Sequence, residues 1–179
     1  MKLIVKKRTD AGCLKCLLVV LLVVLSNASF AQSGPTDSLP GDPGALSVYN
    51  VQNMSFGAFS HGAGGGSVTI SGTGSRSFLG NITLLNLGIS YFQAIFDIEA
   101  PQGSIISIMN GPNVTLTGSN GGSMTLQLGS STPSSPFVNT VPSPSRTPVS
   151  VGGTLVVGNA AANPPGTYSG TFFITFNQE

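Results

Sequence analysis

Apolar and polar residues alternate with a period of two through most of the chain after residue 45. A period of two places every second side chain on the same face, which is typical of a β-strand with one buried face. The clearest run is the C-terminal one, residues 167–177, whose apolar positions are Tyr168, Gly170, Phe172, Ile174 and Phe176. Phe173 is the one large apolar residue on its other face. We therefore predict a core strand here that closes the fold.

The same alternation predicts nine strands, separated by Gly, Asn, Ser and Pro. Their ranges are 46–56, 66–71, 76–85, 91–99, 103–109, 113–118, 122–128, 149–157 and 167–177. Asn110-Gly111 and Asn120-Gly121 lie between runs and supply the positive φ angles of tight hairpin turns. Residues 130–148, rich in Ser and Pro, are predicted to form a long surface loop with a short edge strand over 137–141.

No stretch of twelve residues after the N-terminal segment has helical periodicity with caps. Short strands at this spacing indicate an all-β sandwich or barrel. Of the two, we predict an immunoglobulin-like, two-sheet antiparallel β-sandwich of eight or nine strands.

The N-terminus has the pattern of a cleaved signal peptide. Three basic residues, at positions 6–8, precede an apolar run over 17–25, and Ser29-Phe30-Ala31 places small residues before a cut at Gln32. The run is shorter than the ~20 apolar residues that span a bilayer. We predict a signal peptide over 1–31, a Pro/Gly-rich linker over 32–44 and a single β-sandwich domain over 45–179, with no stable membrane span after cleavage.

The predicted cleavage also removes the cysteines and most of the basic residues. The removed segment contains both cysteines, Cys13 and Cys16, and five of the seven basic residues. The remaining chain has no cysteine and therefore no disulfide. Its charged residues are Arg76, Arg146 and five acidic residues, which give a net charge of −3. Nucleic acids and anionic membranes need clustered Lys and Arg, so we expect neither as a partner.

His61, the only histidine, lies in the glycine-rich sequence 60–66. A metal site or a catalytic base would need partners, and no second His or Cys follows residue 31. We interpret His61 as an exposed turn residue. Gly62 to Gly66 lack the Lys and the helix that phosphate-binding loops require, so we predict a turn or bulge there.

Asp97 and Glu99 stand two apart on one predicted strand, so their side chains share the face opposite Phe96 and Ile98. Such a pair could bind calcium or act as acid and base in glycoside hydrolysis. A solvated outer face at a strand end is the interpretation we favour, with Arg76 as a candidate partner. We also expect Tyr168 in the core, its hydroxyl bonded to a backbone group. We predict no catalytic, cofactor-binding or metal residues and no cofactor.

Two groups of motifs point to a family. Met54-Ser55-Phe56-Gly57-Ala58-Phe59 and residues 65–71 stand near the start, while Val151-Gly152-Gly153-Thr154-Leu155 and Gly166-Thr167-Tyr168-Ser169-Gly170-Thr171-Phe172 stand near the end. This order resembles the bacterial secreted domain-of-unknown-function family 4402, over residues 45–178. That family is similar to spore coat U-like and chaperone–usher pilin-like domains. The resemblance implies an extracytoplasmic β-sandwich with no known catalytic residues.

The pilin-like relatives complete a neighbour's sandwich with an N-terminal donor segment. Here residues 32–44 hold three prolines and one large apolar residue, Leu39, and make a poor donor.

We therefore expect a non-enzymatic protein of the periplasm, cell surface or medium, with a structural or adhesive role. Self-association and other envelope or surface proteins are the expected partners. The alternative is a stand-alone soluble binding module, for example for a glycan, although most phenylalanines fit core faces. A hydrolase using Asp97 and Glu99 is the third hypothesis.

Overall fold

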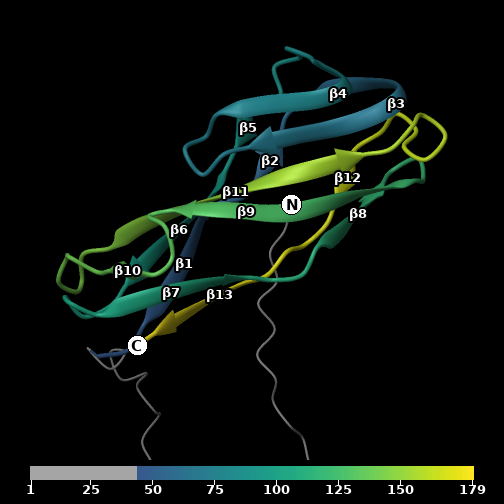
Figure 1. Cartoon of the computed structure of the whole chain (residues 1–179). Coiled ribbons are helices and arrows are strands. Elements are labelled where there is room, and N and C mark those ends of the chain that lie inside the picture. Colours follow the sequence, from purple (N-terminus) through teal and green to yellow (C-terminus); the bar gives the residue numbers. More distant parts are fainter. Residues whose placement is uncertain (1–43) are drawn as a thin grey trace, which may run out of the picture.

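The computed structural model describes residues 44–179, which form an antiparallel all-β structure (Figure 1). The predicted signal peptide, and all but the last residue of the predicted linker, lie outside the described residues. Thirteen strands are present: β1 (Ser47–Gln52), β2 (Ser55–Phe56), β3 (Phe59–Ile70), β4 (Arg76–Leu84), β5 (Tyr91–Phe92), β6 (Ala94–Glu99), β7 (Ile105–Asn110), β8 (Val114–Gly118), β9 (Ser123–Thr132), β10 (Phe137–Val138), β11 (Thr147–Val157), β12 (Tyr168–Ser169) and β13 (Ile174–Gln178).

β11 is the central strand of the larger sheet, which has eight strands. One edge of β11 pairs with β9, and β9 continues the sheet through β8 to β12. The other edge is shared: residues 147–151 pair with β6, and residues 153–157 pair with β3. β1 and β4 extend these two branches. The sheet therefore divides at Gly152, and β4 is the outer strand of one branch.

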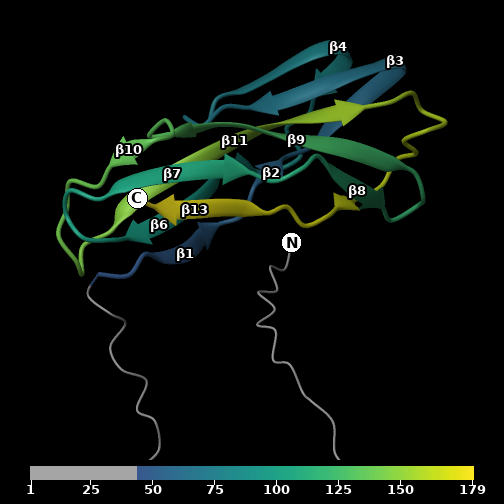
Figure 2. The same ribbon diagram turned by 60° about the horizontal axis from the view of Figure 1, so that its bottom comes forward.

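Two smaller sheets complete the described structure. β7 pairs with β10 and β13, while among the described residues β2 pairs only with β5. Figure 2 shows the β7–β13 pair lying over the sheet that contains β9 and β11. Between the layers lie fully buried aliphatic side chains such as Val68, Ile98 and Val149, and the rings of Phe96 and Phe176 meet at 5.5 Å. The fold is thus a β-sandwich, as the alternating pattern predicts.

The C-terminal alternation is confirmed, although the predicted single strand is divided. Phe172 is buried and its apolar partners on that face are half-buried, while Phe173 is exposed. The chain nevertheless leaves β8 after Ser169 and joins β7 only at Ile174. One face can stay buried through the crossing because the segment passes from one layer to the other over the same core.

Two local predictions are wrong. Asn110-Gly111 does not close a hairpin, because β7 pairs with β10 and β13 while β8 pairs with β9 and β12. Instead Asn110 Nδ2 donates to the carbonyl of Gly129 at 2.8 Å as the chain changes layer. His61 is not in a turn but within β3, which begins seven residues before the predicted strand.

Other turn predictions hold. Asn120-Gly121 lies in the connection of the β8–β9 hairpin, and Gly121 and Gly122 have positive φ. Gly62 to Gly66 form the predicted bulge, between the pairs made by His61 and Gly66 with β4. The short edge strand in the Ser/Pro-rich loop is β10. The immunoglobulin-like connectivity stays a prediction.

Candidate functional site

An open groove of about 600 Å³ is the candidate site. Its floor consists of core side chains from the large sheet, and its walls come from two chain segments far apart in sequence. Ligand sites in proteins are typically concave, mostly apolar and of this size. The floor residues are Leu116, Met124, Leu126 and Leu155; the walls are residues 53–59, with Leu87 and Ile89 on the rim, and residues 164–170 with Phe172.

The first wall is an extended segment held by polar contacts behind it. Ser55 Oγ donates to the carbonyl of Ser90 at 2.9 Å, and Arg76 Nη2 donates to the carbonyl of Ala58 at 2.8 Å. Gly57 has φ of 67°, and a β-carbon there would lie 3.1 Å from the carbonyl oxygen of Ile89. A glycine is therefore needed for this wall to pass close to the rim.

The second wall follows a loop that is anchored in the core by Asn163, which is fully buried. Asn163 Oδ1 accepts from the amide of Gly158, and its Nδ2 donates to the carbonyl of Ser123. The Nε2–H of His61 donates to the Asn163 carbonyl at 2.9 Å. The Tyr168 hydroxyl donates to the Pro164 carbonyl at 2.7 Å, as predicted. These bonds fix the wall to β3 and β9.

Each wall contains a short strand, β2 or β12, with one edge that has no strand partner in the described part of the chain. β12 is the last strand in the order of its sheet, and β2 pairs only with β5. Residues 170–173, which follow β12, belong to no strand. An edge strand presents unpaired N–H and C=O groups, which form a template for another extended chain. The groove therefore combines an apolar floor with hydrogen-bonding edges.

The groove lining contains no Asp, Glu, Lys or Arg. Arg76 bonds to the first wall through the Ala58 carbonyl and is stacked on Tyr91, with 5.3 Å between the guanidinium carbon and the ring centroid. Burial lowers the pKa of Arg76, with Tyr91 acting in the opposite direction. Its Nε is buried and has no hydrogen-bond partner among the described residues. An occupant of the groove is thus expected to be uncharged.

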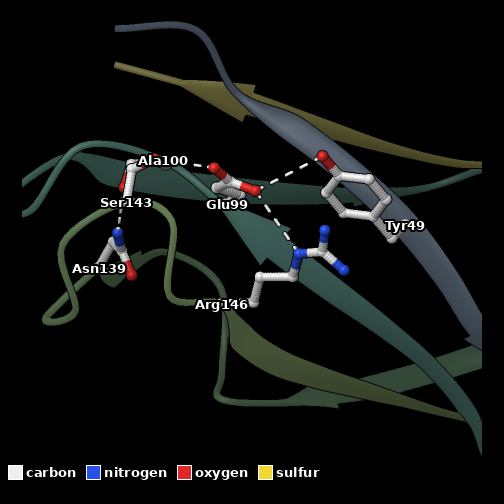
Figure 3. A network of polar contacts seen from close by, with 6 residues as sticks. All are labelled: Tyr49, Glu99, Ala100, Asn139, Ser143 and Arg146. Atoms are coloured by element: carbon white, nitrogen blue, oxygen red, sulfur yellow. Dashed lines mark hydrogen bonds and ion pairs between the residues drawn. The ribbon is translucent and has the colours of Figure 1, made fainter. Parts of the chain in front are cut away.

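Asp97 and Glu99 share one face of β6, as predicted, with Phe96 and Ile98 buried on the other. Glu99 is bonded by residues of other segments (Figure 3): Ser143 Oγ donates to its Oε1 at 2.8 Å, and Arg146 Nε lies 3.5 Å from its Oε2. Arg146, not the expected Arg76, is therefore its cationic partner.

The Arg146 guanidinium also lies 3.6 Å over the ring of Tyr49. The Ser143 hydroxyl, and then Arg146, lower the pKa of Glu99, while desolvation opposes them. The contacts tie β1 and β6 to the loop before β11, which is a structural role. No cluster of three His, Cys, Asp or Glu is found within residues 44–179.

The expectation that most phenylalanines fit core faces is wrong at two positions, because Phe78 and Phe92 are exposed. Phe92 belongs to β5, a separate strand from β6, so its side chain does not continue the buried row of Ala94 and Phe96. No pattern in the sequence predicts the groove, because its walls meet only through tertiary contacts. The local sequence features at the groove are Gly57 in one wall and Pro164, Pro165 and Gly166 in the other.

The family model for a domain of unknown function (DUF4402) matches residues 46–177. The chain belongs to this family. The matched range contains both walls of the groove and its floor. No curated protein and no solved structure matches the chain. No helix in the described part of this DUF4402 chain is long and apolar enough to cross a membrane.

Proposed function

We propose that the protein is an exported, non-enzymatic, structural or adhesive component of the cell envelope or surface, which holds an extended polypeptide segment of another envelope or surface chain in its groove. The observation that carries this proposal is a groove with an apolar floor, beside the edges of β2 and β12 that have no strand partner among the described residues. Concave sites with a mostly apolar lining are where proteins typically bind other molecules.

A polypeptide fits the groove better than an apolar small molecule does. An extended chain gives main-chain hydrogen bonds to an unpaired edge, and its alternate side chains enter the pocket beneath. A lipid tail would cover Leu116 and Met124 but would leave the edge N–H and C=O groups without partners. Because such groups are costly to bury unpaired, they favour a peptide.

The sequence supports the location and the role. The signal-peptide pattern over 1–31 is consistent with export, and the resemblance to pilin-like and spore coat U-like domains supports a structural part at the surface. The linker does not supply the inserted segment, because its three prolines and its two aspartates (Asp37 and Asp42) do not match an uncharged groove. The segment therefore belongs to another chain, or to another region of a second copy.

The test uses the full chain, exported in its host, and two variants with matched changes. Leu87→Asp/Ile89→Asp places charges on the groove rim at positions 67% and 59% exposed, so the fold is retained. Met109→Asp/Val138→Asp makes the same change at exposed positions away from the groove.

We expect the wild-type envelope fraction to show a complex that survives unboiled denaturing gels and disappears on boiling. The rim variant should lose it and the control should keep it. A monomer in unboiled wild-type samples, or a mature protein found only in the cytoplasm, would contradict the proposal.

A glycan-binding module is the second candidate, favoured by the exposed rings of β5. Tyr91 and Phe92 are 45% and 42% exposed, and Arg76 stacks on Tyr91. Aromatic faces flanked by donors suit sugar rings. Binding on a glycan array that is lost in Tyr91→Ala would support this function, and a silent array would reject it. The hydrolase hypothesis predicts a glycosidase activity that Asp97→Asn abolishes.

A further inference from the structure

β4 is the outer strand of its branch of the large sheet and lies at the margin of the molecule in Figure 1. It has nine residues, and its only strand partner among the described residues is β3. In an antiparallel edge strand every second residue directs its N–H and C=O away from the sheet. β4 therefore offers a row of backbone groups for pairing.

Two of the exposed side chains of this edge, Phe78 and Leu79, are large and apolar. Residues 77–81 are all exposed, with Phe78 at 51% and Leu79 at 75%. Leu79 is in register with Ser67 of β3, which is in register with Val156 of β11, itself 41% exposed. On this outer face Ser67 therefore separates Leu79 from Val156, and Leu79 is the exposed apolar residue at the edge itself.

Natural edge strands are usually protected by charges, prolines or shortness. Residues 77–84 of β4 contain no charged residue and no proline. Its pairing is irregular at Gly80, which has φ of 79°, and opposite residues 61–66 of β3, where the register shifts. β1, the outer strand of the other branch, is shorter, with six residues, and has the Arg146 guanidinium over Tyr49.

We propose that β4 pairs antiparallel with β4 of a second copy of this chain, so that the large sheet continues across a two-fold axis near Leu79. When a strand pairs with the same strand of a second copy, each residue near the two-fold axis lies close to the same residue of the other copy. Any charge there would meet a like charge. Residues 77–84 are uncharged and avoid this repulsion. Two-fold pairing also satisfies both edges in one contact and leaves a closed dimer.

The test is the mass in solution of the exported full chain, measured by light scattering over a concentration series. Ser77→Lys/Leu79→Lys places lysines on the outer face of the edge, and Ser77→Glu/Leu79→Glu places glutamates there. Thr171→Lys/Phe173→Lys is the matched control, because it replaces one exposed polar and one exposed apolar residue two apart, outside β4. Circular dichroism and thermal melting check that each variant folds.

We expect a dimer for the wild type and the control. Each edge variant alone should have half that mass, and an equal mixture of the Lys and Glu variants should recover the dimer. A wild type that is monomeric up to its solubility limit, or a dimer unchanged by both edge variants, would overturn the proposal. The groove is a separate surface: Leu87→Asp/Ile89→Asp should leave this dimer intact even if the proposed groove function fails.

Discussion

The loops before and after β11 share one feature, a buried asparagine, but only the loop after the strand borders the groove. Each loop is anchored by a fully buried asparagine: Asn139 in the loop before the strand, and Asn163 in the loop after it. Asn139 Nδ2 donates to the carbonyls of Ala100 and Val141 at 2.7 and 2.9 Å, and its Oδ1 accepts from Thr147 Oγ1 at 2.7 Å. Asn163 makes a comparable set of bonds to Gly158 and Ser123.

Beyond the asparagines the two ends diverge. The Asn139 end is closed by the contacts of Ser143 and Arg146 with Glu99 (Figure 3). The chain beyond Asn163 instead becomes one wall of the groove and leaves Leu116 and Leu155 beneath an opening. Both ends are rich in proline, so composition does not distinguish them. The difference shows that the opening lies between well-fixed walls and is not a region of loose packing.

The largest expected effect comes from removing the anchors. Asn139→Ala leaves the carbonyls of Ala100 and Val141 without their donor, and buried polar groups left unpaired cost about 1–3 kcal/mol each. We expect Asn139→Ala and Asn163→Ala each to lower the free energy of unfolding by about 3 kcal/mol in urea titrations.

Asn120→Ala, which removes one exposed bond to the Pro165 carbonyl, is the control and should cost well under half as much. Equal losses of unfolding free energy in Asn120→Ala and Asn139→Ala would show that the buried asparagines stabilise the fold no more than a surface contact does.

A smaller effect is expected at His61, which fixes the groove wall and not the core. His61→Ala removes the donor to the Asn163 carbonyl and should cost about 1 kcal/mol, the net worth of one hydrogen bond. Amide hydrogen exchange should speed up within residues 158–167 and stay unchanged within 139–147.

His61→Gln keeps an N–H donor and should restore part of the protection. Uniform acceleration across both loops would show that the wall is not separately held by His61.

The smallest effect is expected at the Glu99 network, which is exposed. Because the folded-state pKa of Glu99 is lowered, its contribution to stability is present above the unfolded pKa. It is lost as pH falls through the folded pKa. Melting temperatures from neutral pH down to pH ~3, around the ordinary carboxyl range, should therefore fall slightly less steeply for Glu99→Gln than for the wild type.

Asp97→Asn, on the same face of β6 but outside the network of Figure 3, is the matched control. If the melting temperatures of wild type and Glu99→Gln fall equally with pH, the ionised Glu99 does not stabilise the loop around Asn139.

The sequence predicted the parts of the fold that depend on local alternation. The buried row of Phe96 and Ile98, and the buried face around Phe172, follow from a period of two. It could not predict which strands pair: the Asn110-Gly111 turn signal was present, but the chain changes layer there instead of folding back. Pairing depends on contacts distant in sequence, and a local pattern carries no information on them.

The candidate site was harder to predict for the same reason. Tyr168 and the segment 54–59 were singled out, but as a core residue and as a family motif, not as opposite walls of one groove. His61 was predicted to be a free turn residue because its partner, the Asn163 carbonyl, is 102 positions away. The choice of Arg146 over Arg76 as the partner of Glu99 likewise depends on how the loop before β11 folds.

The most direct test of the central claim is site-specific photo-crosslinking in the exported full chain. A crosslinking side chain at Ser169, on the groove wall, is compared with one at Thr175, exposed on β13 outside the groove. We expect Ser169 to crosslink to one defined segment of another chain, uncharged and with apolar residues at alternate positions, and Thr175 not to crosslink to it. Crosslinks that are absent at Ser169, or the same from both positions, would contradict that claim.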